Sequence, residues 1–138
     1  MDYGLEDLGD SPFAVRFDVG GHVFIGDEPI EAGGAGLGPA PFQLLSAALA
    51  ECTAMTVRWY ARQHKWPVEH ISVQVSYSRI SIEGRSVASD TFSKTVDIRG
   101  DALTQEQRKR LLEIAAKCPV QRTLQGGAAI TTVAGELL

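Results

Sequence analysis

The sequence is poor in several features that would assign a function by themselves. It has two cysteines and three histidines. The histidines are not spaced like the ligands of a metal site, which needs three or four ligands that converge on one point. It has no apolar run long enough to span a membrane, and its first residues are acidic where a signal peptide is basic and then apolar. We therefore predict a cytoplasmic protein with no metal site and no membrane partner.

Positive charge is also scarce. The formal net charge is -4, whereas binding to a nucleic acid requires a concentrated basic surface. The compact basic cluster at Arg108, Lys109 and Arg110 is explained by a solvated helix face. We expect no nucleic-acid partner.

The composition is that of an ordinary folded chain. Apolar residues make up 44% of the 138 positions and charged residues 22%. A chain of this length buries roughly two thirds of the surface that it exposes when unfolded. We predict a loose amino-terminal tail over residues 1–12, which show no periodicity, and a single domain over residues 13–138.

The order of the regular patterns predicts an α+β fold with mostly antiparallel strands and two main helices packed on the sheet. Alternating apolar residues predict strands, Gly20-Gly21 and residues 83–86 are turn signals, and Thr104 with Gln107 forms a capping box. The predicted strands cover residues 13–19, 22–26, 68–82, 93–99 and 128–134, and the predicted helices cover residues 41–66, 104–118 and 119–124.

The helix predicted from Pro41 to Trp66 is the longest element. A loop rich in glycine and proline, residues 27–41, positions Pro41 at its first turn. Its apolar residues recur at helical spacing and predict one buried stripe. These residues are Leu45, Ala48, Leu49, Cys52, Met55 and Trp59.

The two cysteines, Cys52 and Cys118, each lie on the apolar face of a predicted helix. From the pattern alone, two inert buried thiols and a redox pair are about equally favoured. Cys118 precedes Pro119 at a helix end, so its sulfur is expected near free backbone N–H groups that favour the thiolate. Arg16 or Arg122 could add a positive charge, although each could equally be an ordinary surface residue.

Two segments resemble a known family. GLGPAPFQLLSAALAECTAM, followed by a hairpin and then LLEIAAKCPVQRTL, is similar to the OsmC/Ohr family of osmotically inducible and organic-hydroperoxide-resistance proteins, and the resemblance runs from about residue 13 to 134. It implies the OsmC-like fold, in which antiparallel sheets wrap around two central helices in an intertwined homodimer. It also implies two active sites at the subunit interface.

The same resemblance implies a cysteine-based thiol peroxidase that reduces organic hydroperoxides. Cys52 would be the peroxidatic cysteine and form a sulfenic acid, and Cys118 would be the resolving cysteine and form a disulfide with it. Arg16 would be the activating arginine. An external dithiol would restore both thiols by exchange, so no bound cofactor is implied.

One departure from the family supports an alternative function. The peroxidases typically have a glutamate directly after the proline that begins the long helix, and this chain has Phe42 there. The alternative is a dimer that binds a small apolar or electrophilic ligand at the subunit interface without turning it over. A structural dimer with two buried thiols is a third possibility.

Overall fold

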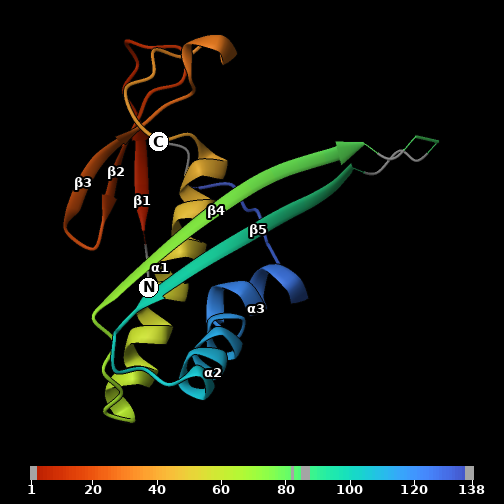
Figure 1. The fold of residues 1–138 in the computed structure, drawn as a ribbon. Coiled ribbons are helices and arrows are strands. Elements are labelled where there is room, and N and C mark those ends of the chain that lie inside the picture. The colour runs from red at the N-terminus through yellow and green to blue at the C-terminus, as the bar shows by residue number, and fades with distance from the viewer. Residues whose placement is uncertain (1–2, 82, 85–87, 136–138) are drawn as a thin grey trace. The chain divides into compact units, whose positions relative to one another are not determined.

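The computed structural model describes residues 3–81, 83–84 and 88–135. Two compact units divide the chain: one contains residues 1–48 and 76–93, and the other contains residues 49–75 and 94–138. The elements follow one another in the order shown in Figure 1. They are β1 (Gly4–Asp7), β2 (Val15–Val19), β3 (His22–Gly26), the short 3-10 helix η1 (Ile30–Ala32), α1 (Pro41–Gln63), β4 (His70–Ser81), β5 (Ala88–Arg99), α2 (Gln105–Ala115) and α3 (Pro119–Gly126).

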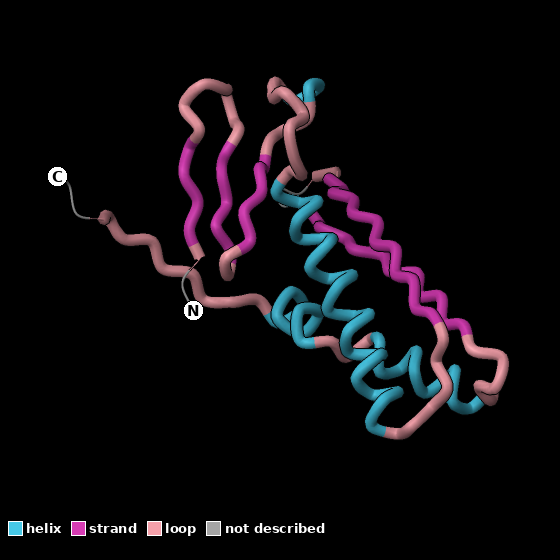
Figure 2. Tube along the Cα trace, turned by 90° about the vertical axis from the view of Figure 1, so that its left-hand side faces the viewer, coloured by secondary structure: helices cyan, strands magenta, loops and turns pink. Residues whose placement is uncertain are grey.

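The first unit is built on a small antiparallel sheet with the strand order β1-β2-β3 (Figure 2). The hairpin of β2 and β3 was predicted, and its turn glycines Gly20 and Gly21 have φ of 59° and 82°, a region that glycine adopts without strain. Phe17 lies opposite Phe24 in the register, and their rings stack with centroids 4.7 Å apart. Arg16 alternates with the half-buried Val15 and Phe17 of β2 and is exposed, as predicted.

The prediction of a loose tail over residues 1–12 is wrong for β1. Gly4–Asp7 pairs with β2, with Gly4 opposite Asp18 and Asp7 opposite Val15. All four residues are exposed, so the strand has no apolar alternation that a sequence pattern could detect. It forms because β2 offers a second edge with unpaired backbone groups.

A loop that folds around Asp27 joins this sheet to α1. The Asp27 side chain is 4% exposed, and its carboxylate accepts hydrogen bonds from the backbone N–H groups of Glu28, Ala35 and Leu37 at 2.8, 3.1 and 3.2 Å. Glycine is required at position 34, because a Cβ there would lie 2.0 Å from the Glu28 carbonyl oxygen. The predicted irregular segment is therefore an ordered loop.

Helix α1 begins at Pro41, as predicted, and ends at Gln63, three residues before the predicted end at Trp66. Its last turn closes with Lys65 in the left-handed conformation, with φ of 54°. The N–H groups of Lys65 and Trp66 donate to the carbonyls of Arg62 and Ala61 at 3.2 and 2.8 Å. This pair of hydrogen bonds is a Schellman motif, and it stops the helix before Pro67.

The predicted buried stripe of α1 is partly wrong. The fully buried residues of α1 recur every four positions, at Leu49, Thr53, Val57 and Ala61, whereas Met55 and Trp59 are both 62% exposed. Helix α1 thus carries apolar residues on two sides. The predicted stripe included only Leu49 of the residues that this chain buries most deeply along α1.

The core of the second unit joins the later turns of α1 to β5 and α2 (Figure 1). Thr104 caps α2 through the predicted capping box with Gln107. The β4 and β5 strands pair in a two-stranded sheet, as predicted. The buried core residues are Val57, Ala61, Ile98, Leu103, Leu111 and Ala115.

The strand predicted over residues 128–134 is absent from the described residues, where this segment has no regular structure. Ile130 and Val133 favour a strand by propensity, but both are highly exposed. A strand needs a partner edge as well as a favourable composition. Neither described sheet supplies that edge to residues 128–134.

Candidate functional site

Both cysteines lie in the second unit and both are free thiols. Cys52 is on α1 and is half-buried, whereas Cys118 follows α2 and is 0% exposed. Cys52 is next to Thr53 in α1, and the Thr53 side chain is buried. Thr53 contacts Cys118, so this part of α1 lies against the segment that carries Cys118.

Thr53 joins Cys118 to a lysine. Its Oγ1 lies 3.5 Å from the Cys118 Sγ and accepts a hydrogen bond from Lys94 Nζ at 2.9 Å. Lys94 also donates to the Ala115 carbonyl oxygen at 2.7 Å. Helix α1, strand β5 and the segment that follows α2 therefore each place one group in a single cluster, which we call the Lys94–Thr53–Cys118 cluster.

Cys118 is also the amino-terminal cap of α3. Its Sγ accepts a hydrogen bond from the Gln121 backbone N–H at 3.4 Å, and Pro119 occupies the first helical position. The free N–H groups and the positive end of a helix dipole both stabilise negative charge at such a position. The predicted proximity of Cys118 to backbone donors is confirmed.

These contacts lower the pKa of the Cys118 thiol. Burial acts to raise this pKa, but hydrogen bonds from Thr53, the Gln121 N–H and Cys52, together with the charge of Lys94, outweigh it. The pKa of Lys94 is lowered by burial, against the opposing influence of Cys118 and Cys52. The lysine charge therefore acts on both sulfurs.

The hydrogen bonds of this cluster do not include the side chain of Arg122. Arg16 is exposed on β2, in the first unit, and Arg122 is exposed on α3, where its backbone N–H donates to the Cys118 carbonyl oxygen at 3.1 Å. The cation in the cluster is Lys94, which the sequence interpretation missed. The role of Arg16 stays a prediction.

A signal for Lys94 was present in the sequence. Strand β5 alternates, and Lys94 has the same parity as the inward residues Val96 and Ile98. A lysine on the inward side of a strand must find partners, because a buried ammonium is costly when it is unpaired.

The three histidines are exposed. In the part of the chain that the structure describes, no group of three or more potential ligands is placed to hold a metal ion. None of the helices described there combines the length and the hydropathy that crossing a membrane requires.

Comparison with known proteins identifies the family. The family model described as OsmC-like protein matches residues 33–133, more than half of the chain. The chain belongs to the OsmC-like family. A search of the curated proteins found no match.

Solved structures share the OsmC fold with this chain. An organic hydroperoxide resistance protein, OsmC, from Legionella pneumophila is 23% identical, with a TM-score of 0.68 over 91% of this chain and 90% of that chain. The OhrB protein of Bacillus subtilis is 19% identical, with a TM-score of 0.66 over 91% of this chain and 92% of that chain. An OsmC-like protein from Mycoplasma pneumoniae is 17% identical, with a TM-score of 0.72 over 91% of this chain and 89% of that chain. At these identities the likeness concerns the fold.

Within this OsmC-like chain, Phe42 belongs to an aromatic cluster of the first unit. Its ring stacks on Tyr77 with centroids 4.7 Å apart, and Tyr77 in turn lies 4.9 Å from Phe92. The Tyr77 hydroxyl donates to Asp90, which also forms an ion pair with Arg79 at 3.0 Å. The first turn of α1 thus presents an aromatic ring at the position after Pro41.

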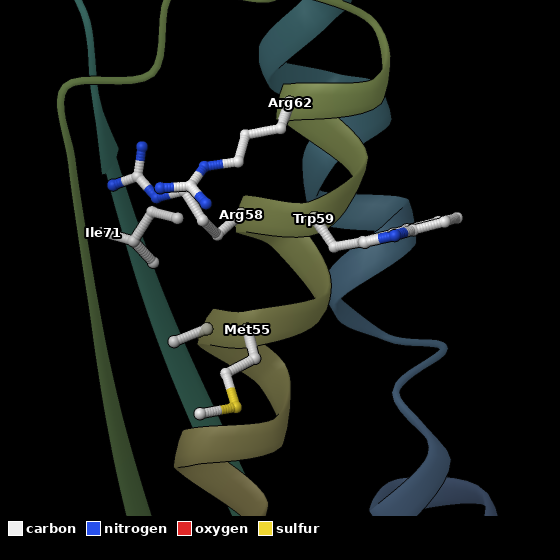
Figure 3. A pocket seen from close by; sticks show the side chains of 6 residues that line it. Met55, Arg58, Trp59, Arg62 and Ile71 are labelled. Carbon is white, nitrogen blue, oxygen red and sulfur yellow. The ribbon is translucent and has the colours of Figure 1, made fainter.

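A shallow hollow of about 450 Å³ lies along the exposed side of α1 in the second unit (Figure 3). Arg58 and Arg62 extend toward the side of Ile71, and Trp59 points the other way (Figure 3). Arg58 is held by a hydrogen bond from its guanidinium to the Val68 carbonyl oxygen at 2.8 Å. The hollow therefore combines apolar walls with positive charge.

Proposed function

We propose that this chain is a thiol peroxidase that reduces organic hydroperoxides, and that it serves peroxide detoxification in an oxidative stress response. The observation that carries the proposal is the Lys94–Thr53–Cys118 cluster beside Cys52. Together with Cys52, the cluster brings two free thiols, a cation and a helix N–H group close to one another. A thiolate held in such a place is a nucleophile that can attack a peroxide.

The reaction assigns a different role to each cysteine. The Cys52 thiolate attacks the outer peroxide oxygen, the O–O bond breaks, and the alkoxide takes a proton to leave as an alcohol. Cys52 is then a sulfenic acid. Cys118 attacks its sulfur, water leaves, and a Cys52–Cys118 disulfide remains until an external dithiol reduces it by exchange.

The exposure of the two sulfurs supports this division of roles. Cys52 is half-buried, whereas Cys118 is fully buried, so Cys52 is the sulfur that a hydroperoxide can reach. The relatives from Legionella and Bacillus that are named for organic hydroperoxide resistance support the same substrate class. A reducing compartment such as the cytoplasm would supply the dithiol.

A homodimer is part of this proposal. Met55 and Trp59 form an exposed apolar pair on α1, one turn apart. Large apolar side chains that remain exposed on one helix mark an interaction surface. A second copy of the chain would cover this pair, and the activating arginine that the family resemblance predicts, Arg16, would act within that dimer.

The test of the peroxidase function measures the loss of an alkyl hydroperoxide in the presence of a dithiol reductant. We expect rapid turnover by the wild type, only background loss with Cys52→Ser, and consumption of about one equivalent by Cys118→Ser, which halts at the sulfenic acid. A wild type that is no faster than Cys52→Ser would overturn the proposal.

A second candidate function is binding of a small apolar or electrophilic ligand without turnover. Phe42 favours it, because an aromatic stack replaces the glutamate that is typical of the peroxidases. The hollow beside Trp59 offers a site. In this case cumyl alcohol would quench the tryptophan fluorescence of the wild type but not of Trp59→Phe, and peroxide loss would be equal in the wild type and Cys52→Ser.

A further inference from the structure

The Thr53 hydroxyl has more acceptors than it can serve. Its single proton can be donated either to the Leu49 carbonyl oxygen at 2.7 Å or to the Cys118 Sγ at 3.5 Å. The carbonyl is the nearer acceptor while Cys118 is a neutral thiol. An ionised sulfur is the stronger acceptor, because hydrogen bonds to a charged group are roughly twice as strong as neutral ones.

Lys94 favours that second arrangement. It donates to the oxygen of Thr53, which polarises the hydroxyl and strengthens the bond that the hydroxyl donates. If Lys94 only stabilised the fold, its hydrogen bond to the Ala115 carbonyl oxygen at the end of α2 would be sufficient. The contact with Thr53 directs the same ammonium toward the sulfur as well.

Three elements of the second unit supply the groups that act on the Cys118 sulfur. Helix α1 supplies Thr53 and the titratable Cys52, strand β5 supplies the charged Lys94, and α3 supplies the Gln121 N–H. Each of these hydrogen bonds or charges stabilises negative charge on Cys118, against the cost of its burial.

We propose that Lys94, acting through Thr53, holds Cys118 as a thiolate, so that Cys118 attacks the oxidised Cys52 and later leaves when the disulfide is reduced. Lys94 is thus a positioning residue. The ionisation of Cys118 does not depend on the proposed peroxidase function, whereas the two redox steps rest on it.

In the first step, the Cys118 thiolate displaces hydroxide from the Cys52 sulfenic acid, a proton converts the hydroxide to water, and the S–S bond forms. In the reduction, a thiolate of the external dithiol attacks the Cys52 sulfur, the S–S bond breaks, and Cys118 leaves as a thiolate. The second thiol of the reductant then displaces Cys52 and the reductant becomes a disulfide. Attack at Cys52 is favoured because Cys118 is inaccessible, and the lowered pKa of the Cys118 thiol makes it a better leaving group.

The first experiment titrates Cys118 alone. In a Cys52→Ser background, the thiolate absorbance at 240 nm is followed against pH, without any peroxide. We expect both Lys94→Met and Thr53→Val to raise the midpoint by about one pH unit or more, because each removes one link between the cation and the sulfur. Lys94→Arg and Thr53→Ser should keep the midpoint low, since they retain the charge and the hydroxyl.

The matched control is Lys109→Met, which removes one charge from an exposed position of α2 and should leave the midpoint unchanged. Lys94→Met also removes the donor to the Ala115 carbonyl and could unfold the protein, in which case Thr53→Val and Thr53→Ser decide. Midpoints that agree between Thr53→Val and its parent would overturn the proposal, because loss of stability alone does not move the midpoint of the folded protein.

The second experiment tests the leaving group. Diamide forms the disulfide without peroxide in the protein with both cysteines, and dithiothreitol then reduces it. We expect Thr53→Val and Lys94→Met to be reduced more slowly than the wild type, by roughly threefold for each unit of increase in the pKa of Cys118. Equal rates, or no disulfide in the wild type, would overturn the redox part. A failed peroxidase assay with a lowered Cys118 midpoint would overturn only the proposed function.

Discussion

At the scale of single residues, Asp27 determines the shape of the loop that precedes α1. Its two carboxylate oxygens accept three backbone hydrogen bonds that reach as far as Leu37. An asparagine has one acceptor oxygen, and its NH₂ group would face backbone N–H groups. At a residue this buried, the lost acceptor leaves donors unsatisfied.

We therefore expect Asp27→Asn to lower the free energy of unfolding by about 1–3 kcal/mol. Urea denaturation of the two proteins measures the difference. Asp18→Asn, at an exposed position of β2, is the matched control and should have little effect. Equal losses for both variants would show that the hydrogen bonds of Asp27 contribute nothing specific.

Asp90 should make stability depend on acidic pH. Its pKa is lowered from 3.8 by hydrogen bonds from Tyr77 and then from Arg79. A lowered pKa in the folded state gives a stabilisation that is fully present above the unfolded value and is lost as the pH falls through the folded value. The contribution should therefore begin to decline below about pH 3.8 and be lost as the pH falls through the lower pKa of the folded state.

The measurement compares the urea midpoints of the wild type and Asp90→Asn at about pH 5 and about pH 2.5. We expect the wild type to have the higher urea midpoint at the upper pH and the gap to narrow at the lower pH. A gap that is the same at both values would mean that the charge of Asp90 plays no part.

The site shows which residues a sequence can assign and which it cannot. Cys118 was predicted to lie near helix N–H donors because Pro119 marks a helix start, and this local feature is present. Lys94 was missed because its neighbours Thr53 and Ala115 are distant in sequence. The alternation of β5 indicated that the Lys94 side chain faces inward, but alternation does not show which residues that side chain contacts.

At the scale of elements, the end of α1 contains a strained residue. Lys65 adopts a left-handed φ of 54° to close the Schellman motif. A side chain with a Cβ pays about 1–2 kcal/mol for this conformation, and glycine does not. The greater freedom of glycine in the unfolded chain offsets part of that gain.

We expect Lys65→Gly to raise the free energy of unfolding by about 1 kcal/mol, as measured by urea denaturation. Gln63→Gly, two residues earlier and inside the helix, should lower it by roughly 0.5–1 kcal/mol. A loss of stability with Lys65→Gly would show that the lysine side chain stabilises this turn in another way.

The elements were predictable where their signal was local. The turn at Gly20-Gly21, Pro41 and the capping box at Thr104 each mark a boundary that the structure has. Two errors in the predicted strands arose because a strand depends on pairing with another strand, which can be distant in the sequence. β1 is a strand because β2 offers it an edge, and residues 128–134 are irregular although their composition favours a strand.

At the scale of the whole molecule, the exposed apolar side of α1 is the feature that the fold of one chain does not explain. The sequence analysis assigned Met55 and Trp59 to the buried stripe, and the structure leaves both exposed. Hydrophobic periodicity predicts that an apolar face is covered. It does not distinguish between cover by the same chain and cover by another.

The dimer proposed above gives a direct prediction for this face. Placing a charge at Trp59, where we propose that a second copy buries it, should be strongly unfavourable, because a charge must not be buried without a partner. We expect Trp59→Asp to raise the dissociation constant of the dimer by roughly thirtyfold or more, the effect of losing a central aromatic contact of an interface. Sedimentation equilibrium measures this constant.

The control Leu112→Asp, at another exposed apolar residue, on α2, should leave the dissociation constant unchanged. A wild type that sediments as a monomer at micromolar concentration would refute the dimer, and equal effects of the two variants would place its interface elsewhere.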